Sequence, residues 1–342
     1  MTERDAAPPP APSPKGRGEK RKRQQLHGWI VLDKPLGLTS TQALGKVRWL
    51  FNADKAGHGG TLDPLASGLL PIAFGEATKT IQWAMDGRKT YRFTVQWGAE
   101  TSTDDLEGEI ISISNYLIKD SENNVLPQSS DFAAMQHELM ALLPKFHGAV
   151  QQQPPAYSAI KVDGERAYDL ARAGEVVELA ARTVDIHALR IVNWPTPSQT
   201  TFEVDCGKGT YVRSIARDLG RATGWLGHVV FLRRIAVGPF REQDMISLEK
   251  LEELSHRAAS ESSLIGLLRP IETVLDGIPA LAVMEAEAKR LQHGQRVKLP
   301  EGETLREAEA VLVTHTGIPI GMFRIEQGVL KTIRMFNLDA RS

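Results

Sequence analysis

The stretch that decides the fold is GHGGTLDPLASGLLPIAFG, which runs from Gly57 to Gly75. The glycines at its start let the backbone pass close to a ligand, because a side chain would block that approach. Asp63 is its single acidic residue, and the proline that follows favours an extended backbone, so a stiff loop presents the carboxylate. The apolar run from Leu69 to Phe74 predicts a buried strand that anchors this loop.

Two other interpretations of this loop stay open on its residues alone. An ordinary turn, in which the Asp63 side chain accepts backbone hydrogen bonds, also explains an isolated Leu-Asp-Pro. A glycine-rich loop can bind phosphate as well, but no Gly-Lys-Ser/Thr follows it. The missing lysine argues against the phosphate loop of nucleotide triphosphatases.

The stretch resembles the signature loop of the TruB family of pseudouridine synthases, whose usual form is GHTGTLDPLATG. Only Gly59 and Ser67 depart from that form, each standing where the family usually has Thr. The resemblance implies that Asp63 is the catalytic residue. It also implies the α/β (α+β) pseudouridine synthase fold, which has a mixed, largely antiparallel central sheet flanked by helices.

Other blocks of the family recur along the chain in the expected order. DKPLGLTS, at residues 33–40, resembles the first family motif and is expected to pack beneath the catalytic loop. Tyr91 lies in the alternating strand KTYRFTVQWG, where an aromatic side chain usually belongs to the core. The resemblance instead implies that Tyr91 lies against the target base beside Asp63. KGTYVR, which ends at Arg213, resembles the KGTYIR block and implies that this arginine pairs with Asp63.

Four further residues are expected to bind the substrate. His58, inside the signature loop, is expected to make a shape or stacking contact with displaced nucleotides. Lys79 lies in a short predicted helix at residues 76–84. HVVFLRRI, at residues 228–235, resembles the family's LRR block. That likeness places Leu232 near the active site and Arg233, with Arg234, toward RNA.

The chemistry that the resemblance implies needs an ionised carboxylate. A carboxylate beside the ribose can stabilise or trap positive charge at C1′. A neighbouring arginine lowers the pKa of a carboxylate by about 1–3 units, so we expect Arg213 to keep Asp63 charged. Tyr91 is a candidate for stacking on the base and for removing the C5 proton. Attack by Asp63 at C1′, attack at C6 and assistance to elimination all stay open.

Charge is segregated along the chain, although the net charge is only −1. Residues 1–25 and residues 198–241 each carry seven Lys and Arg against three Asp and Glu, whereas residues 98–131 carry eight acidic residues and one lysine. This pattern predicts one side that faces phosphate and an acidic loop, residues 100–109, on a solvated side. Three arginines at helical spacing usually form a solvated face; they are Arg213, Arg217 and Arg221.

Composition limits the class of protein. With 342 residues, 42% hydrophobic and 24% charged, the chain can form two globular domains. No apolar run approaches a membrane span, and no signal-peptide core is present, so we expect a cytoplasmic protein without a membrane partner. Cys206 is the only cysteine, which excludes an internal disulfide and a multi-cysteine metal site. The reaction needs neither a metal nor a small-molecule cofactor.

The domain organisation is expected in three parts. Residues 1–25 form a disordered basic tail, because their Pro- and Ala-rich composition cannot bury a core. Residues 26–277 form the catalytic domain, in which residues 151–175 resemble the mobile RNA-binding insertion of bacterial family members. Residues 278–342 form a small β-rich unit that resembles the PUA-like RNA-binding domain.

The resemblance implies a stand-alone tRNA pseudouridine synthase, acting as a monomer on the uridine at position 55 of the T stem-loop. A guide-RNA-dependent synthase of the archaeal and eukaryotic branch is an alternative, because it shares the aspartate loop. A tRNA-binding folding chaperone with vestigial catalysis is another. The set of Asp63, Tyr91 and Arg213 favours the enzyme.

Overall fold

The computed structural model describes residues 22–338, except residues 116, 120–124, 128–131, 159, 163, 174–178, 258–261 and 301–303. Most of the expected basic tail lies outside this range. Its last residues belong to the fold, because the Asn52 carbonyl accepts the Gln24 N–H at 2.8 Å and the Gln24 carbonyl accepts the Asp54 N–H at 2.9 Å. The folded part therefore begins before residue 26.

A mixed sheet forms the centre of the described chain. Its ten strands follow the order β16-β1-β3-β14-β4-β13-β12-β9, with β15 paired to β14 and β2 paired to β3. All neighbours are antiparallel except β1 with β16 and β3 with β14, which confirms the largely antiparallel sheet. The strands are β1 (Gly28–Lys34), β2 (Ala56–His58), β3 (Ala66–Phe74), β4 (Lys89–Trp97), β9 (Gly148–Gln152), β12 (Arg182–Thr196), β13 (Gln199–Cys206), β14 (Gly227–Val237), β15 (Phe240–Arg241) and β16 (Ile246–Ser247).

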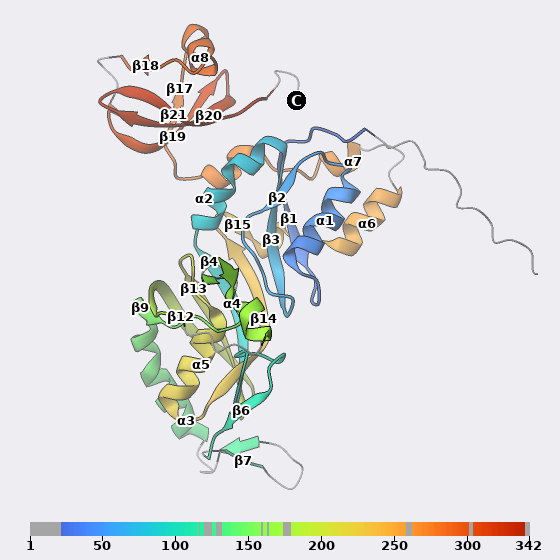
Figure 1. Ribbon diagram of the computed structural model, residues 1–342, viewed down its shortest axis with the longest axis vertical. Helices are drawn as coiled ribbons and strands as arrows, with labels where there is room; N and C mark the ends of the chain where they lie inside the picture. The colour runs from blue at the N-terminus through green and yellow to red at the C-terminus, as the bar shows by residue number, and fades with distance from the viewer. Residues whose placement is uncertain are drawn as a thin grey trace, which may run out of the picture.

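Helices cover this sheet, with α1 and α6 side by side at one end and α3 and α5 together at the other (Figure 1). Helix α1 begins after Thr39, whose side chain accepts the Gln42 N–H in a capping box. The α-helices are α1 (Ser40–Leu50), α2 (Ile81–Asp86), α3 (Phe132–Leu142), α4 (Ala167–Arg172), α5 (Val212–Thr223), α6 (Leu248–Arg257), α7 (Ser262–Ile265) and α8 (Glu285–Gln292). Short 3₁₀ helices are η1 (Gly75–Thr80), η2 (Leu143–Phe146), η3 (Glu242–Asp244) and η4 (Ile271–Leu275).

Strand β1 is buried on both faces, which explains its unbroken apolar sequence. Ile30 and Leu32 belong to the core beneath α1, whereas Trp29 and Val31 belong to a second core on the opposite face. Cys206, at the end of β13, is fully buried, and burial raises the pKa of its thiol to about 11. The cysteine is therefore structural.

Three small hairpins project from the central sheet. The middle part of the chain forms two of them, and the third lies in the segment expected as an RNA-binding insertion, where it is followed by α4. The motion expected of that segment stays a prediction. The hairpins pair β5 (Ala99–Thr101) with β6 (Ile110–Ile113), β7 (Leu117–Lys119) with β8 (Val125–Pro127), and β10 (Lys161–Val162) with β11 (Glu165–Arg166).

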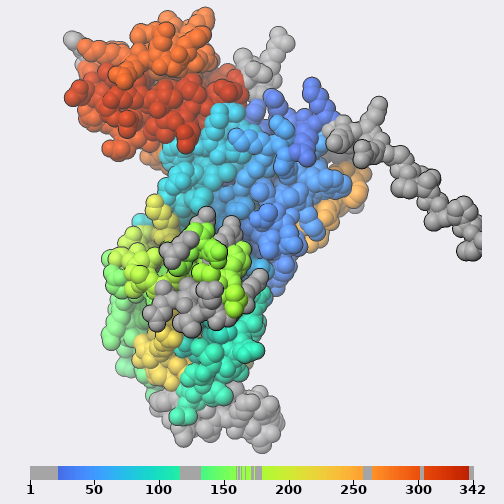
Figure 2. Space-filling view, in the orientation of Figure 1, coloured from blue at the N-terminus to red at the C-terminus, as the bar shows by residue number. Residues whose placement is uncertain are grey.

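The C-terminal residues form a separate β-rich unit at one end of the molecule (Figures 1 and 2). Its sheet has the order β17-β19-β20-β21-β18 and a core of its own beneath α8. Three of its side chains, Leu312, Met322 and Phe336, also pack into the second core with Trp29. The strands are β17 (Ala280–Ala282), β18 (Val297–Lys298), β19 (Ala308–His315), β20 (Ile318–Glu326) and β21 (Val329–Met335).

Candidate active site

The loop between β2 and β3 carries Asp63 and is held from below by the segment after β1. The Ser40 hydroxyl donates to the Leu62 carbonyl at 3.0 Å and accepts the Leu62 N–H at 2.8 Å. The Pro64 carbonyl accepts the Gly37 N–H at 2.9 Å. These bonds flank Asp63 on both sides and confirm that the DKPLGLTS block packs beneath the loop.

Arg234 holds the same loop from behind. It is 1% exposed, and its guanidinium donates to the carbonyls of Leu69 at 2.7 Å, Gly60 at 3.0 Å and Thr61 at 3.3 Å. The expectation that Arg234 faces RNA is therefore wrong. The residue lies on β14, next to β3, and its donors bond two carbonyls of the loop, those of Gly60 and Thr61, and one of β3, that of Leu69.

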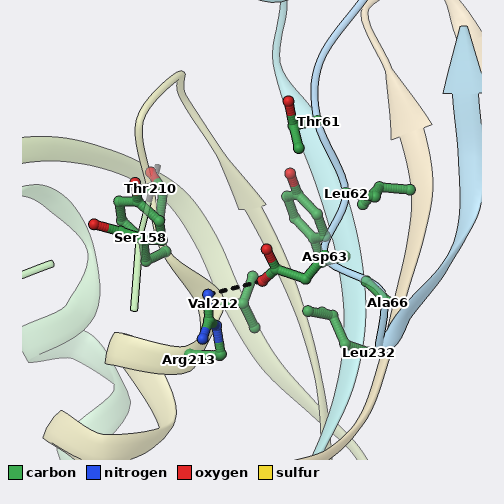
Figure 3. Close-up of a pocket in the computed structure, with 11 residues that line it drawn as sticks. Thr61, Leu62, Asp63, Ala66, Ser158, Thr210, Val212, Arg213 and Leu232 are labelled. Atoms are coloured by element: carbon green, nitrogen blue, oxygen red, sulfur yellow. Dashed lines mark ion pairs between the residues drawn. The ribbon is translucent and has the colours of Figure 1, made fainter. Parts of the chain in front are cut away.

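A cavity of about 190 Å³ opens above this loop (Figure 3). Four residues that the sequence singled out line it together: Asp63, Tyr91, Arg213 and Leu232. They come from the loop, β4, α5 and β14, so the central sheet and one helix bring distant segments to one place. The adjacency of β4 and β14 sets Leu232 opposite Phe93, two residues from Tyr91.

Arg213 forms an ion pair with Asp63, with 2.9 Å between Nη2 and Oδ2. The arginine side chain is 8% exposed, whereas that of Asp63 is 43% exposed toward the cavity. Asp105 pairs with Arg213 Nη1 at 3.1 Å, and the carbonyls of Thr103 and Tyr157 accept from the guanidinium at 3.1 and 3.0 Å. These partners fix the guanidinium, so it can aim the Asp63 carboxylate.

Only part of the acidic stretch lies on a solvated side, because Glu107 and Glu109 are exposed and its other three carboxylates are buried. Glu100, Asp104 and Asp105 are each 5% exposed. Opposite charges that are distant in sequence meet here, because a buried carboxylate needs a cationic partner. The expectation of a solvated acidic loop is therefore wrong for these three carboxylates. That of a solvated arginine stripe is wrong for Arg213 and Arg217, which are buried. Each arginine of α5 pairs with one of these carboxylates: Arg213 with Asp105, Arg217 with Asp104, and Arg221 with Glu100.

Tyr91 is half-buried on β4 and contributes to the cavity wall. Burial raises the pKa of its hydroxyl. The side chain is therefore a neutral phenol at neutral pH, which suits contact with a base and makes it a weak proton acceptor there.

Lys34 is a buried residue of the site that the sequence reasoning missed. It is 0% exposed, and its ammonium group donates to the carbonyls of Pro35 at 2.9 Å and Leu38 at 2.7 Å. Burial lowers its pKa to about 8, while the charge of Asp63 acts in the opposite direction. A lysine at the end of a buried, mostly apolar strand was the available signal.

The other three expected substrate contacts do not line the cavity. His58 ends β2, where burial lowers its pKa, so its ring is neutral at neutral pH. Lys79 donates to Glu76 at 2.6 Å and to the Met335 carbonyl at 2.8 Å, which ties η1 to the C-terminal unit. Arg233 pairs with two carboxylates on the surface beside β1, those of Asp33 at 2.9 Å and Glu242 at 3.0 Å.

Neither a metal centre nor a membrane span is found in the part of the chain that the structure describes. No group of three or more His, Cys, Asp or Glu residues there could hold a metal ion. No helix there is long and apolar enough to cross a membrane.

Comparison with known proteins gives consistent matches. Residues 48–212 match the family described as TruB family pseudouridylate synthase (N terminal domain). Residues 213–276 match the tRNA pseudouridylate synthase B C-terminal domain. The tRNA pseudouridine synthase B of Bradyrhizobium diazoefficiens is 52% identical over 92% of this chain and 87% of its own length. That of Brucella melitensis is 45% identical over 91% of this chain and 96% of its own.

Solved structures share the fold at low identity. A Cbf5-Nop10-Gar1 complex contains a chain with a TM-score of 0.67 and 21% identity, over 95% of this chain and 91% of that one. An H/ACA RNP bound to a substrate RNA containing 2′-deoxyuridine contains another, with a TM-score of 0.66 and 20% identity, over 91% of this chain and 86% of that one. These likenesses show the fold, and the sequence matches show the family. The chain belongs to the TruB family of pseudouridylate synthases.

Proposed function

We propose that this chain converts the uridine at position 55 in the T arm of tRNA into pseudouridine. The observation that carries the proposal is the ion pair between Asp63 and the buried Arg213 at the wall of a cavity. The name tRNA pseudouridine synthase B, printed for relatives 45–52% identical to this chain, supports tRNA as the substrate class.

The geometry of the site supports the chemistry that we assign to it. A uridine stacked in an RNA loop must be flipped out to reach the cavity, at a cost of a few kcal/mol. Asp63 presents an oxygen toward the ribose side of the flipped nucleotide and acts on it as the carboxylate of the reaction. Arg213 keeps that carboxylate aimed, and Tyr91 offers its neutral ring to the uracil.

Recognition of the T stem-loop is assigned to several surfaces around the cavity. Leu232 contacts the flipped nucleotide, and His58 stacks with nucleotides displaced from the loop. The insertion at residues 151–175 and the PUA-like unit after residue 277 bind the RNA backbone. Lys79 and Arg233 have protein partners already, so each must exchange a carboxylate for a phosphate to bind RNA. The proposed enzyme acts as a monomer and without a cofactor.

The two alternatives predict different requirements. A guide-RNA-dependent enzyme needs an added guide RNA to select its uridine. A folding chaperone with vestigial catalysis binds tRNA without modifying it. Purified protein should be incubated with an unmodified tRNA transcript, without guide RNA or cofactor, and pseudouridine should then be mapped. Product at position 55 supports the proposal, and its absence contradicts it.

Asp63→Asn tests the catalytic assignment. We expect it to abolish turnover while tRNA affinity stays within about tenfold, because phosphate and shape contacts supply most of the binding. Asp54→Asn is the matched control, since Asp54 is exposed on a turn away from the cavity, and it should retain activity. Turnover above a few per cent in Asp63→Asn would show that another group does the chemistry.

A further inference from the structure

The hydroxyl of Ser158 is a buried polar group without a protein partner. The residue is 3% exposed, and its Oγ has no hydrogen-bond partner among the residues that the structure describes. Ser158 lines the same cavity as Asp63. In Figure 3 it lies beside Thr210, across the cavity from Thr61, Leu62 and Leu232.

The backbone around Ser158 is held in place. Its N–H donates to the Ala156 carbonyl at 3.0 Å, and its carbonyl accepts the Tyr168 N–H at 3.1 Å. The carbonyl of the preceding Tyr157 accepts from Arg213 at 3.0 Å. The arginine that orients Asp63 thus also holds the backbone next to Ser158.

Nearby polar side chains in the cavity wall are already engaged. The Thr210 hydroxyl donates to the Gly207 carbonyl at 3.2 Å. The two terminal nitrogens of Arg213 bond to carboxylates and carbonyls. A buried hydroxyl that is left unpaired is unfavourable, so a ligand that supplies its partner gains affinity and orientation.

We propose that Ser158 Oγ donates a hydrogen bond to a carbonyl oxygen of the target uracil and so helps to select and orient the base. The inference rests on the proposed function, because it takes the flipped uridine as the occupant of the cavity. A hydroxyl suits this ligand, since uracil presents two carbonyl oxygens, O2 and O4, with N3–H between them.

The same hydroxyl can serve the base before and after the reaction. The N1–C1′ bond breaks, the uracil turns over, the C5–C1′ bond forms, C5 loses its proton and N1 gains one, so no atoms are added or removed. Turning the ring about its N3–C6 axis exchanges O2 with O4. A donor beside one carbonyl in uridine therefore faces the other carbonyl in pseudouridine.

Thio-substituted RNA tests this contact. Single-turnover rates at saturating RNA should be measured on tRNA with uridine, 2-thiouridine or 4-thiouridine at the target. Ser158→Ala should slow the uridine reaction by roughly three- to tenfold, the effect of one neutral hydrogen bond. For each protein, the rate on the uridine substrate is divided by the rate on the thio substrate. Because sulfur is a weak acceptor, this ratio should be at least about threefold larger for the wild type than for Ser158→Ala. Any effect of sulfur on the chemistry itself is the same for both proteins and cancels in the comparison.

Thr210→Val is the matched control, because it removes a cavity hydroxyl that already has a partner. It should keep the wild-type discrimination against sulfur, and circular dichroism should show all variants folded. A larger ratio with both thio substrates supports the contact in both orientations. A larger wild-type ratio with only one thio substrate supports the contact but contradicts the idea that the contact is made both before and after the uracil turns over. Equal ratios in the wild type and Ser158→Ala with both thio substrates overturn the contact. Absence of pseudouridine from wild-type protein on the uridine substrate would instead contradict the proposed function.

Discussion

Lys34 shows how a single buried residue links the site to pH. Its ammonium group is fully buried and is bonded to two carbonyls instead of a carboxylate. Burial lowers its pKa from 10.5 to about 8. Between these values the unfolded chain holds more protons at this position than the folded protein, so the free energy of unfolding rises with pH.

Comparison with Lys34→Met isolates this contribution. We expect the difference in unfolding free energy, wild type minus variant, to rise by about 2–3 kcal/mol from pH 8 to pH 10.5. Urea unfolding across this range measures it, and Lys46→Met, at an exposed position of α1, is the matched control. A constant or falling difference would contradict a depressed pKa for Lys34.

At this scale the sequence predicts residues whose role follows from a motif and misses those whose role follows from burial. Asp63, Tyr91, Arg213 and Leu232 meet in one cavity, as expected. Ser158 was not singled out, because the sequence does not show that its hydroxyl is enclosed and unpaired. Burial is a property of the packed fold, and a serine looks the same in a loop or a cavity wall.

Helix α5 and the acidic stretch behave as one element. Their carboxylates and guanidinium groups are paired, in the interior for Arg213 and Arg217 and at its edge for Arg221, so the arginines are already engaged by carboxylates. The presence of strand β3 was predictable from the apolar run Leu69 to Phe74, although the strand begins earlier, at Ala66. The pairing was not, because segregated charge in a sequence fits a solvated face and a buried ion-pair array equally well.

Arg217→Met and Arg221→Met test this pairing. Arg217 and its partner Asp104 are each 7% exposed, so the first change should cost about 3–5 kcal/mol of unfolding free energy. The Arg221 side chain is 52% exposed but its partner Glu100 is buried, so the second change leaves a buried carboxylate unpaired and should cost less, about 1–3 kcal/mol. Urea unfolding and tRNA binding at several salt concentrations measure these effects. Neither variant should change how steeply the tRNA-binding constant falls with salt concentration. If the slope of its logarithm against the logarithm of salt concentration became smaller by about 0.7–0.9, the arginine would make a direct phosphate contact.

On the scale of the molecule, the C-terminal unit is both a candidate RNA-binding surface and a part of the packing. Phe336 shares a core with Trp29 of β1, and the Asn337 N–H donates to Glu76 at 2.7 Å. The β-rich composition was predictable from the alternating strands. The shared core was not, because an apolar residue on a strand does not show which sheet it will face.

Removal of residues 278–342 separates the two contributions. We expect weaker tRNA binding and lower stability, because the second core loses the side chains that the C-terminal unit contributes to it. We also expect measurable chemistry, since Asp63, Tyr91 and Arg213 all precede the cut. Single-turnover assays at saturating tRNA and thermal unfolding measure this. Lys79→Gln, which loosens the contact without removing the unit, should have the smaller effect. A truncated protein that is folded yet inactive at saturating tRNA would contradict this division.

The bonds around the catalytic loop decide which molecule must adapt when enzyme and RNA meet. Ser40, Gly37 and Arg234 hold the loop in the free protein. Little conformational entropy is therefore left for the loop to lose on binding. The RNA has to unstack its nucleotide, so the deformation falls mainly on the substrate. An RNA loop that is already distorted should fit this rigid site more readily than a well-stacked one.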